Sequence, residues 1–374
     1  MDISRLKESL SGVEDPRREW GNLRHKLEDI LIIGLCSVVC CGEDFVDMEE
    51  FGNDREDGLR GFLELPNGIP DSDTFRRLFQ SVDPKALSKC LNAALENTRA
   101  RGRGVNIDGK TIRGSADAAH GAYHVVSAWV KENNITLGEL ATEEKSNEIT
   151  AIPALLDTLD VAGDVVTLDA MGCQADIAAK IREKKADYVL ALKDNQPTLH
   201  GEVARYFDWV EAEKPAGEGV ARWQGPLEKG HGRLEQREVL AAPADWLDAK
   251  EKARWPDLRT VVRCRGTREV DGVRSVTVRH FLSSCAADAE FLAGVIRGHW
   301  SIENGLHWML DVVFREDAAR ARKDHSPLNM NVLRKTALSL VKGVVLPKSR
   351  LSVRKKMMKA ARDPTFLDVI IAKK

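Results

Sequence analysis

The sequence predicts an α/β fold with a β-rich insertion, preceded by a helical N-terminal module. Three observations indicate this. Residues 1–95 have the character of helices, strand-like and helix-like segments alternate between residues 104 and 193, and residues 211–285 contain runs of alternating polar and apolar residues. The 374 residues suffice for two or three domains around at least one large core.

The N-terminal module is predicted from an apolar segment and a turn. Residues 25–36 have a charged start and an apolar body, as a buried helix does. Residues 66–70 form a Pro-Asn-Gly-Ile-Pro turn, and residues 71–75 then offer N-cap side chains to a further helix. We therefore expect residues 1–95 to form a small helical module.

The central segment contains three strands followed by helix, strand, helix and strand. The expected strands are 105–110, 123–130, 135–140, 164–169 and 187–193, and the expected helices are 149–159 and 174–185. This order is the one expected of a ribonuclease-H-like fold, although periodicity alone leaves other α/β folds open.

Residues 211–285 interrupt this alternation and are predicted to be a β-rich insertion. Residues 233–240, 259–265 and 275–282 alternate polar and apolar residues, as half-exposed antiparallel strands do. Helices are expected to resume at Asp288 and to continue to about Lys342. The expected domains are thus the helical module 1–95, a catalytic domain 96–345 that contains the insertion, and a C-terminal tail 346–374.

The charge is unevenly distributed along the chain. The net charge is −2, but residues 320–374 contain 15 Lys or Arg and three acidic residues, which gives this segment +12. A basic segment attached to an acidic body suggests contact with a polyanion. The alternative is a solvated helix surface.

Composition limits the location of the protein. The longest apolar run, residues 30–41, is too short to span a bilayer, and no leader-like segment opens the chain. The seven cysteines include no CxxC pair, and their odd number argues against a disulfide framework. We therefore expect a cytoplasmic protein without membrane contact.

Two aspartates follow buried-type strands. Asp108 follows the apolar residues of the first strand and precedes a glycine, and Asp169 ends the strand 164–169 before a turn into a helix. Ligands bind at the carboxyl ends of strands in open α/β sheets, and carboxylate oxygens suit Mg²⁺. The alternative for each, taken singly, is an ordinary turn or N-cap aspartate.

Glu303 is the third candidate acid. At 100° per residue, an apolar stripe on its helix is formed by Ile302, Leu306, Met309 and Val313. Glu303 and His299 lie one turn apart on the border of this stripe, from which a carboxylate can reach the edge of a sheet. The alternatives are an ordinary boundary glutamate and a zinc site formed by His299, Glu303 and His307.

Six sequence motifs, in order, resemble those of one family. They are Ile107-Asp-Gly-Lys-Thr-Ile-Arg-Gly-Ser115, Lys145-Ser-Asn-Glu-Ile-Thr-Ala151, Leu168-Asp-Ala-Met-Gly-Cys-Gln174, Tyr188-Val-Leu-Ala-Leu-Lys-Asp-Asn-Gln196, His231-Gly-Arg233 and His299-Trp-Ser-Ile-Glu-Asn-Gly-Leu-His-Trp-Met-Leu-Asp311. The chain resembles, over nearly its whole length, the H-repeat-associated (ISAs-type) insertion-sequence transposases of the DDE superfamily.

The resemblance implies a ribonuclease-H-like core in which Asp108, Asp169 and Glu303 are the catalytic, metal-binding residues. One departure from the wider superfamily matters. A Tyr-x2-Arg-x3-Glu-x6-Lys signature is replaced here by Ile296, His299, Glu303 and Leu310. The glutamate is therefore carried over, the Tyr, Arg and Lys roles are not, and His299 is expected to replace the arginine as a phosphate contact.

The implied activity is DNA transposition in a bacterial cytoplasm, in association with the nucleoid. Two Mg²⁺ ions, for which Mn²⁺ can substitute, would neutralise the three carboxylates, activate a water or a 3′-hydroxyl, and stabilise the leaving oxygen. The implied partners are terminal inverted repeats and target DNA, bound by a homodimer. The expected DNA contacts are Lys110, Arg113, His299, Arg354, Lys355 and Lys356.

The sequence leaves two rival functions open, and three tryptophans offer further DNA contacts. The chain could be a non-catalytic DNA-binding remnant, although retention of all three acidic residues argues against this. It could be a phosphotransferase with Asp108 as a covalent nucleophile, but position 110 is Lys, so the usual Asp-x-Asp pattern is absent. Trp223, Trp246 and Trp255 lie in the insertion, where each is either a core residue or stacks on a flipped base.

Overall fold

The computed structural model of the chain describes residues 3–17, 23–96, 104–116, 121–142, 148–213, 219–230, 232–346 and 350–371. The chain divides into two compact units. Unit 1 comprises residues 1–100, 109–147 and 303–374, and unit 2 comprises residues 101–108 and 148–302. The expected boundaries at residues 95 and 345 differ from this division, because the chain crosses between the units more than once.

The N-terminal residues of unit 1 are helical, as predicted. The helices are α1 (Ile3–Leu10), α2 (Leu27–Val39), α3 (Phe45–Asp54), α4 (Glu56–Leu59), α5 (Ser72–Ser81) and α6 (Pro84–Glu96). Asp71 is the N-cap of α5, and its carboxylate accepts a hydrogen bond from the Thr74 N–H at 2.7 Å. Helix α2 is buried almost throughout because its apolar residues occur on all of its sides.

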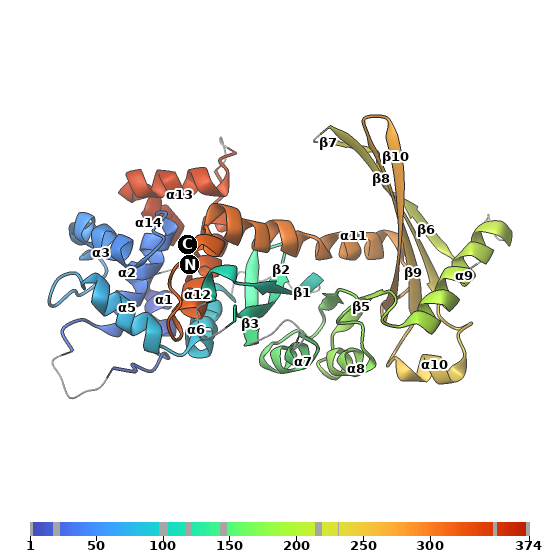
Figure 1. Cartoon of the computed structure of the whole chain (residues 1–374), viewed down its shortest axis with the longest axis horizontal. Helices are drawn as coiled ribbons and strands as arrows, with labels where there is room; N and C mark the ends of the chain where they lie inside the picture. Colours follow the sequence, from blue (N-terminus) through green and yellow to red (C-terminus); the bar gives the residue numbers. More distant parts are fainter. Residues whose placement is uncertain are drawn as a thin grey trace. The chain divides into compact units, whose positions relative to one another are not determined.

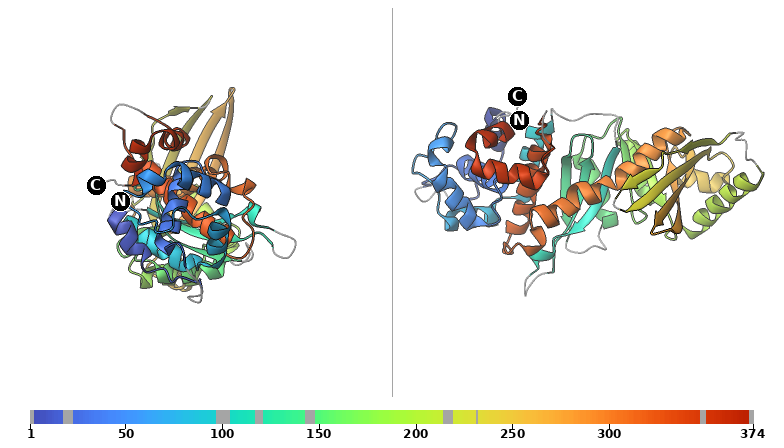
Figure 2. Two further views of the ribbon diagram at one scale, coloured as in Figure 1. Left: turned by 90° about the vertical axis from the view of Figure 1, so that its left-hand side faces the viewer. Right: turned by 90° about the horizontal axis from the view of Figure 1, so that it is seen from above.

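The C-terminal residues of unit 1 are also folded helices. They form α12 (Ser326–Gly343), α13 (Val353–Arg362) and α14 (Pro364–Ile371). We expected residues 346–374 to form a separate basic tail, but α13 and α14 contact α2 and α12, and these red and orange helices lie among the blue N-terminal helices in Figure 2. The physical reason is an apolar face, with Met357, Phe366 and Ile370 buried between the charged residues.

Strand β1 (Gly104–Thr111) belongs to both units, since the division falls after Asp108. In unit 1 it neighbours β2 (His124–Val130), which pairs antiparallel with β3 (Ile135–Thr142). In unit 2 it pairs parallel with β4 (Val165–Leu168), which pairs parallel with β5 (Asp187–Leu192). Helix α7 (Glu148–Thr158) contacts α8 (Ala175–Glu183), which contacts β5 (Figure 1). This order of strands and helices confirms the ribonuclease-H-like prediction.

The insertion extends the sheet of unit 2 through β5. Its elements are α9 (Pro197–Glu213), β6 (Ala221–Gln224), β7 (Glu228–Gly230), β8 (Arg233–Pro243), α10 (Ala249–Arg254), β9 (Thr260–Val270) and β10 (Val273–Ser283). Strand β10 pairs antiparallel with β5, and the order continues as β9, β8 and β6. The three predicted strands are confirmed, but the preceding helix α9 was not predicted.

Helix α11 (Ala289–His299) covers part of this sheet. It contacts β4, β6 and β8, and its apolar residues Leu292, Val295 and Ile296 share a buried cluster with Val262 and Phe281. Its N-cap is Asp288, the residue at which helices were expected to resume. This contact places the C-terminal end of α11 beside the strands that carry the candidate aspartates.

Candidate active site

Asp108 and Asp169 lie at equivalent positions on neighbouring parallel strands. The register pairs Val105 with Val166 and Asn106 with Thr167. Continued by two residues, it places Asp108 opposite Asp169, about one strand spacing of ~4.8 Å away. Both side chains are half-buried. The two residues therefore lie side by side where β4 ends, but Asp108 does not follow its strand as expected, because β1 continues to Thr111.

Asp169 also has a role in the turn that follows β4. Its Oδ1 accepts hydrogen bonds from the N–H groups of Met171 at 2.9 Å and Gly172 at 3.2 Å. Both bonds involve Oδ1, and neither involves Oδ2. The turn role and a ligand role for Asp169 are therefore compatible. A Cβ at Gly172 would lie 3.0 Å from the Cβ of Leu168, so this position favours glycine.

Two side chains that the sequence reasoning missed support this turn. The Asn195 amide donates to the carbonyl oxygens of Ala170 and Cys173, and the Gln196 amide donates to that of Cys173 at 3.2 Å. Both residues follow β5, the next parallel strand. Two consecutive amides directly after a buried strand are the sequence signal that could have identified them.

Cys173 lies buried beside this edge of the sheet. The side chain is fully buried, and burial together with the nearby Asp169 raises the pKa of its thiol to about 12. The thiol therefore stays protonated at neutral pH. The donors at this edge are carboxylate oxygens, which suit Mg²⁺ or Mn²⁺ rather than a soft metal.

His299 connects α11 to the strands that precede these carboxylates. Its Nδ1 lies 2.8 Å from the Oγ1 of Thr167, and the Thr167 hydroxyl donates to the Oδ1 of Asn106 at 2.8 Å. Because the threonine has a single hydroxyl proton, Nδ1 of His299 is the donor in its bond.

Glu303 begins a π-helix, η3 (Glu303–His307), and a second one, η4 (Met309–Val313), follows. It is the first residue of this part of unit 1, four residues after the end of α11. Its side chain is exposed, and its Oε2 lies 3.7 Å from Nδ1 of the buried His307. Since Thr167 engages Nδ1 of His299, a zinc site of His299, Glu303 and His307 would have to use Nε2 of His299.

The predicted apolar stripe on this segment was wrong in its second half. The residues that are buried are Ile302, Leu306, Leu310 and Phe314, spaced by four. Met309 and Val313 are only half-buried. The reason is the wider turn of a π-helix, whose hydrogen bonds span five residues and move the buried face by one position.

Lys110 does not present its charge to solvent. Its Nζ lies 2.7 Å from Asp311 and 3.0 Å from Glu316, and only 10% of the side chain is exposed. Burial opposes the charged form, but Glu316 and Asp311 raise the pKa of Lys110 above its usual value. The expected DNA contact of Lys110 is therefore replaced by ion pairs with carboxylates. Arg113 is 81% exposed and remains accessible.

The basic residues of α13 also divide into exposed cations and one cation that is bound within the protein. Arg354 and Lys355 are exposed. Lys356 donates hydrogen bonds to the carbonyl oxygens of Val341 and Val344, at 3.2 and 2.6 Å, at the end of α12. Its charge is used to cap that helix.

The insertion tryptophans have different environments. Trp255 is buried in the core, Trp223 is half-buried, and Trp246 stacks on Tyr206 with ring centroids 4.2 Å apart. The motif residues 145–147 and His231 lie outside the described residues.

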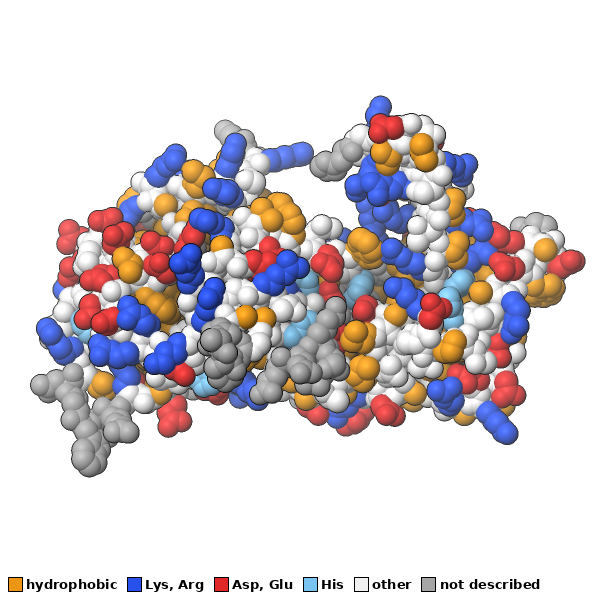
Figure 3. Space-filling view, in the orientation of Figure 1, with side chains coloured by type: hydrophobic (Ala, Val, Ile, Leu, Met, Phe, Trp, Pro, Cys, Tyr) orange, Lys and Arg blue, Asp and Glu red, His pale blue; other side chains and the backbone are white. Residues whose placement is uncertain are grey.

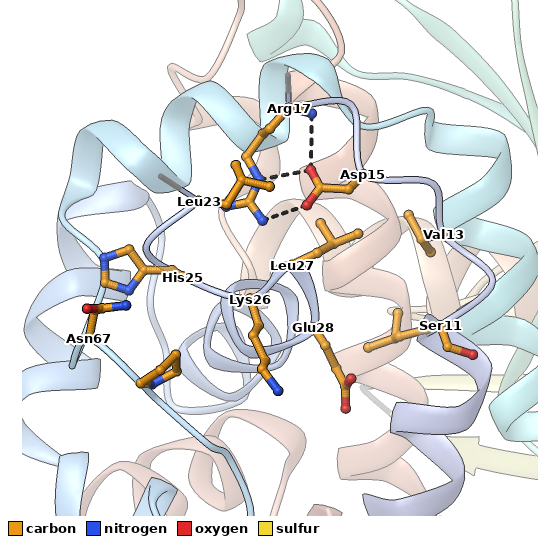
Figure 4. A pocket seen from close by; sticks show the side chains of 12 residues that line it. Ser11, Val13, Asp15, Arg17, Leu23, His25, Lys26, Leu27, Glu28 and Asn67 are labelled. Atoms are coloured by element: carbon orange, nitrogen blue, oxygen red, sulfur yellow. Dashed lines mark hydrogen bonds and ion pairs between the residues drawn. The ribbon is translucent and has the colours of Figure 1, made fainter. Parts of the chain in front are cut away.

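Figure 4 shows a pocket of about 560 Å³ in the N-terminal helices of unit 1. Its charged lining residues form ion pairs: Arg17 with Asp15 at 2.7 Å, Glu28 with Lys7 at 3.8 Å, and Lys26 with Glu64. It contains none of the candidate acids. Over the described ranges, no helix combines the length and apolar character needed to cross a membrane.

Comparisons with known proteins identify the family. The model described as "Transposase DDE domain" matches residues 99–340, and the model described as "DDE_Tnp_1-associated" matches residues 7–94. The chain therefore belongs to the DDE-domain transposases.

Its relatives place it in the H-repeat-associated group. A "Putative transposase YncI" of Escherichia coli O157:H7 is 36% identical over 100% of this chain and 95% of that protein. An "H repeat-associated putative transposase YhhI" of Escherichia coli strain K12 is 34% identical over 100% of this chain and 99% of that protein. A piggyBac transposase synaptic complex with hairpin DNA matches with a TM-score of 0.46 and 11% identity, over 98% of this chain and 81% of that one.

Proposed function

We propose that this transposase cuts DNA at the terminal inverted repeats of its own insertion sequence and joins the cut ends to target DNA. The observation that supports this proposal is the placement of Asp108 and Asp169 side by side where β4 ends, next to the helix that leads to Glu303. The three carboxylates of the family signature are then the catalytic residues.

Asp108, Asp169 and Glu303 are the proposed ligands of two Mg²⁺ ions, with Mn²⁺ as a substitute. The donor set fits, because it is made of hard carboxylate oxygen atoms. When bound, such ions lower the pKa of a water or a 3′-hydroxyl and stabilise charge at a phosphate.

The residues around the site hold it in place. The backbone N–H groups of Met171 and Gly172 fix one oxygen of Asp169, and Asn195 fixes the turn that carries them. Thr167 and Asn106 fix His299, so the end of α11 cannot move away from the strand ends without losing these bonds. The proposed role of His299 is to contact a DNA phosphate.

The proposed partners are the inverted repeats and the target DNA, with a homodimer as the active form in the bacterial cytoplasm, on the nucleoid. The exposed cations Arg113, Arg354 and Lys355 are the proposed contacts to DNA phosphates. Lys110 and Lys356 are assigned to structural roles instead.

The experiment uses purified protein and duplexes from the inverted repeats that flank its own gene. We expect strand cleavage with Mg²⁺ or Mn²⁺, none in excess chelator, and binding with little turnover in Ca²⁺. Asp108→Asn and Glu303→Gln should abolish cleavage, whereas Asp71→Asn, a change at an N-cap far along the chain in unit 1, should not. Binding without any cleavage would favour the DNA-binding remnant, and a trapped phospho-aspartate would favour the phosphotransferase.

A further inference from the structure

The outer part of the insertion sheet is not covered by the helices of unit 2. Residues 233–238 of β8 are half-buried, and residues 273–278 of β10 are exposed. In Figure 1 this part of β8, β9 and β10 extends beyond α9, α10 and α11. Two-sided exposure of long strands leaves both sheet faces available for a partner.

The register places four arginines on one of these two faces. Arg237 lies opposite Gly266, which lies opposite Thr277, and Arg268 lies opposite Ser275. Since side chains alternate between faces, the arginines that share a face are Arg233, Arg237, Arg268 and Arg279, and we call this surface the arginine face. Farther along, the same face packs against α11 through Val239, Val262 and Phe281.

Acidic residues only partly neutralise the arginine face. Glu235 pairs with Arg233 at 2.7 Å and with Arg237 at 2.9 Å, and Glu228 pairs with Arg237 and Arg297. Arg268 and Arg279 form no ion pair with any residue that the structure describes. Figure 3 shows Lys and Arg gathered on these extended strands. The arginine face therefore has an excess of positive charge.

The opposite face lacks this excess. It carries Arg263 and Arg265, which both pair with Glu211. It also carries Arg274 directly opposite Glu269, with the exposed apolar side chains of Val276 and Val278 beyond them. Arg274 is as exposed as Arg268 and stands on the same extended strands. It therefore provides a matched control for charge alone.

Trp300 connects the arginine face with the candidate active site. Its ring is 54% exposed, and the guanidinium carbon of Arg279 lies 4.7 Å from the ring centroid. The preceding residue, His299, contacts Thr167 two residues before Asp169. A flat, exposed aromatic ring thus lies between the arginines and the carboxyl edge of the sheet.

We propose that the arginine face binds the phosphate backbone of duplex DNA, and that Trp300 packs against the nucleotide that enters the active site. Guanidinium groups match phosphate in geometry and charge, and an aromatic face stacks on any base. The choice of DNA as ligand rests on the proposed function.

Binding in chelator, measured by fluorescence anisotropy against salt concentration, tests the arginine face without requiring cleavage. The probes are a duplex of the flanking inverted repeat and an unrelated duplex of equal length. Arg268→Ala and Arg279→Ala should each reduce the log–log salt slope by about one unit on both probes, whereas Arg274→Ala should leave it unchanged. Equal slopes for all four proteins, or an equal loss in Arg274→Ala, would overturn the proposal.

The proposed role of Trp300 predicts a change in DNA affinity and no change in the salt slope. Trp300→Ala should weaken binding by roughly fivefold or more without changing the salt slope, because stacking releases no counterions. Trp246→Ala, which removes the ring stacked on Tyr206, should change neither. Unchanged affinity in Trp300→Ala would contradict the assignment. If binding follows these expectations but Mg²⁺ supports no cleavage, the proposed function is wrong and DNA binding by the arginine face is confirmed. If Mg²⁺ supports cleavage but the arginine variants keep the salt slope of the unaltered chain, the proposed function is confirmed and DNA binding by the arginine face is wrong.

Discussion

Lys342 donates a hydrogen bond from its Nζ to the carbonyl oxygen of Gly305, 2.6 Å away, in the π-helix that begins at Glu303. The same ammonium lies 5.1 Å from the centroid of the Trp129 ring, and burial lowers the pKa of Lys342 to about 8. A π-helix is uncommon and short, so contacts from outside it matter for its stability. Lys342 is therefore a positioning residue for the segment that carries Glu303.

Lys342→Met should disturb that segment. The Gly305 carbonyl would lose its side-chain donor, at an expected cost of about 1–3 kcal/mol in the free energy of unfolding, and DNA cleavage should slow. Lys356→Met is the matched control, because Lys356 also caps carbonyl oxygens but at the end of α12. Urea unfolding and cleavage rates measured below both melting temperatures compare them. Equal cleavage by both variants would contradict a positioning role.

Lys110→Met should destabilise the fold much more than Arg113→Met. Lys110 neutralises Glu316, which is fully buried and also lies 3.6 Å from Arg334. Breaking a buried ion-pair network on one side typically costs about 3–5 kcal/mol. The exposed Arg113 should contribute less than about 0.5 kcal/mol to stability, and its replacement should instead weaken DNA binding.

Urea unfolding and DNA titrations of these two variants separate the roles. If Lys110→Met is as stable as the unaltered chain and binds DNA less tightly, the structural role of Lys110 in ion pairs with Glu316 and Asp311 is contradicted.

We expect His280 to cause part of the loss of stability of unit 2 at acidic pH. Burial, with the positive charges of His200 and Arg263, lowers the pKa of His280 to about 4, while Asp208 opposes this. The unfolded chain, with an ordinary histidine pKa, then binds more protons than the folded chain between about pH 4 and 6.5. Stability should fall as the pH falls through this range, and His280→Phe should lose that component. Parallel pH dependences of unfolding in both proteins would contradict the assignment.

Much of the fold could be predicted because it depends on local patterns. Asp71 as an N-cap, the buried strand before Asp169 and the alternation around Arg237 are each set by a few neighbouring residues. The neighbouring positions of Asp108 and Asp169 followed from their places on two parallel strands, although β1 continues past Asp108 to Thr111.

The features that were not predicted depend on residues far apart in the chain. The partners of Lys110 are about 200 residues away, so its sequence context suggested an exposed cation. In the sequence Lys356 resembles its neighbours Arg354 and Lys355, and only its contact with the end of α12 in the folded protein distinguishes it. The π-helices could not be predicted from a period of 100° per residue, which assumes an α-helix. They are contacted by side chains from outside the segment, such as Lys342.

Asp169→Asn tests, with little structural disturbance, whether Asp108, Asp169 and Glu303 form the proposed metal site. An asparagine oxygen can still accept the bonds from Met171 and Gly172, so the change removes mainly a charge. If the three carboxylates converge, relief of their repulsion should leave the metal-free fold as stable or more stable, by about 1 kcal/mol.

Thermal melts of the unaltered chain and Asp169→Asn, each with and without Mg²⁺, are the most direct measurement. Asp71→Asn, at the N-cap of α5, is the control for an aspartate that accepts a backbone bond elsewhere. We predict that Mg²⁺ raises the melting temperature of the unaltered chain and of Asp71→Asn but not of Asp169→Asn, because only binding to the folded state stabilises it. A destabilised Asp169→Asn that still responds to Mg²⁺ as the unaltered chain does would contradict the proposed metal site.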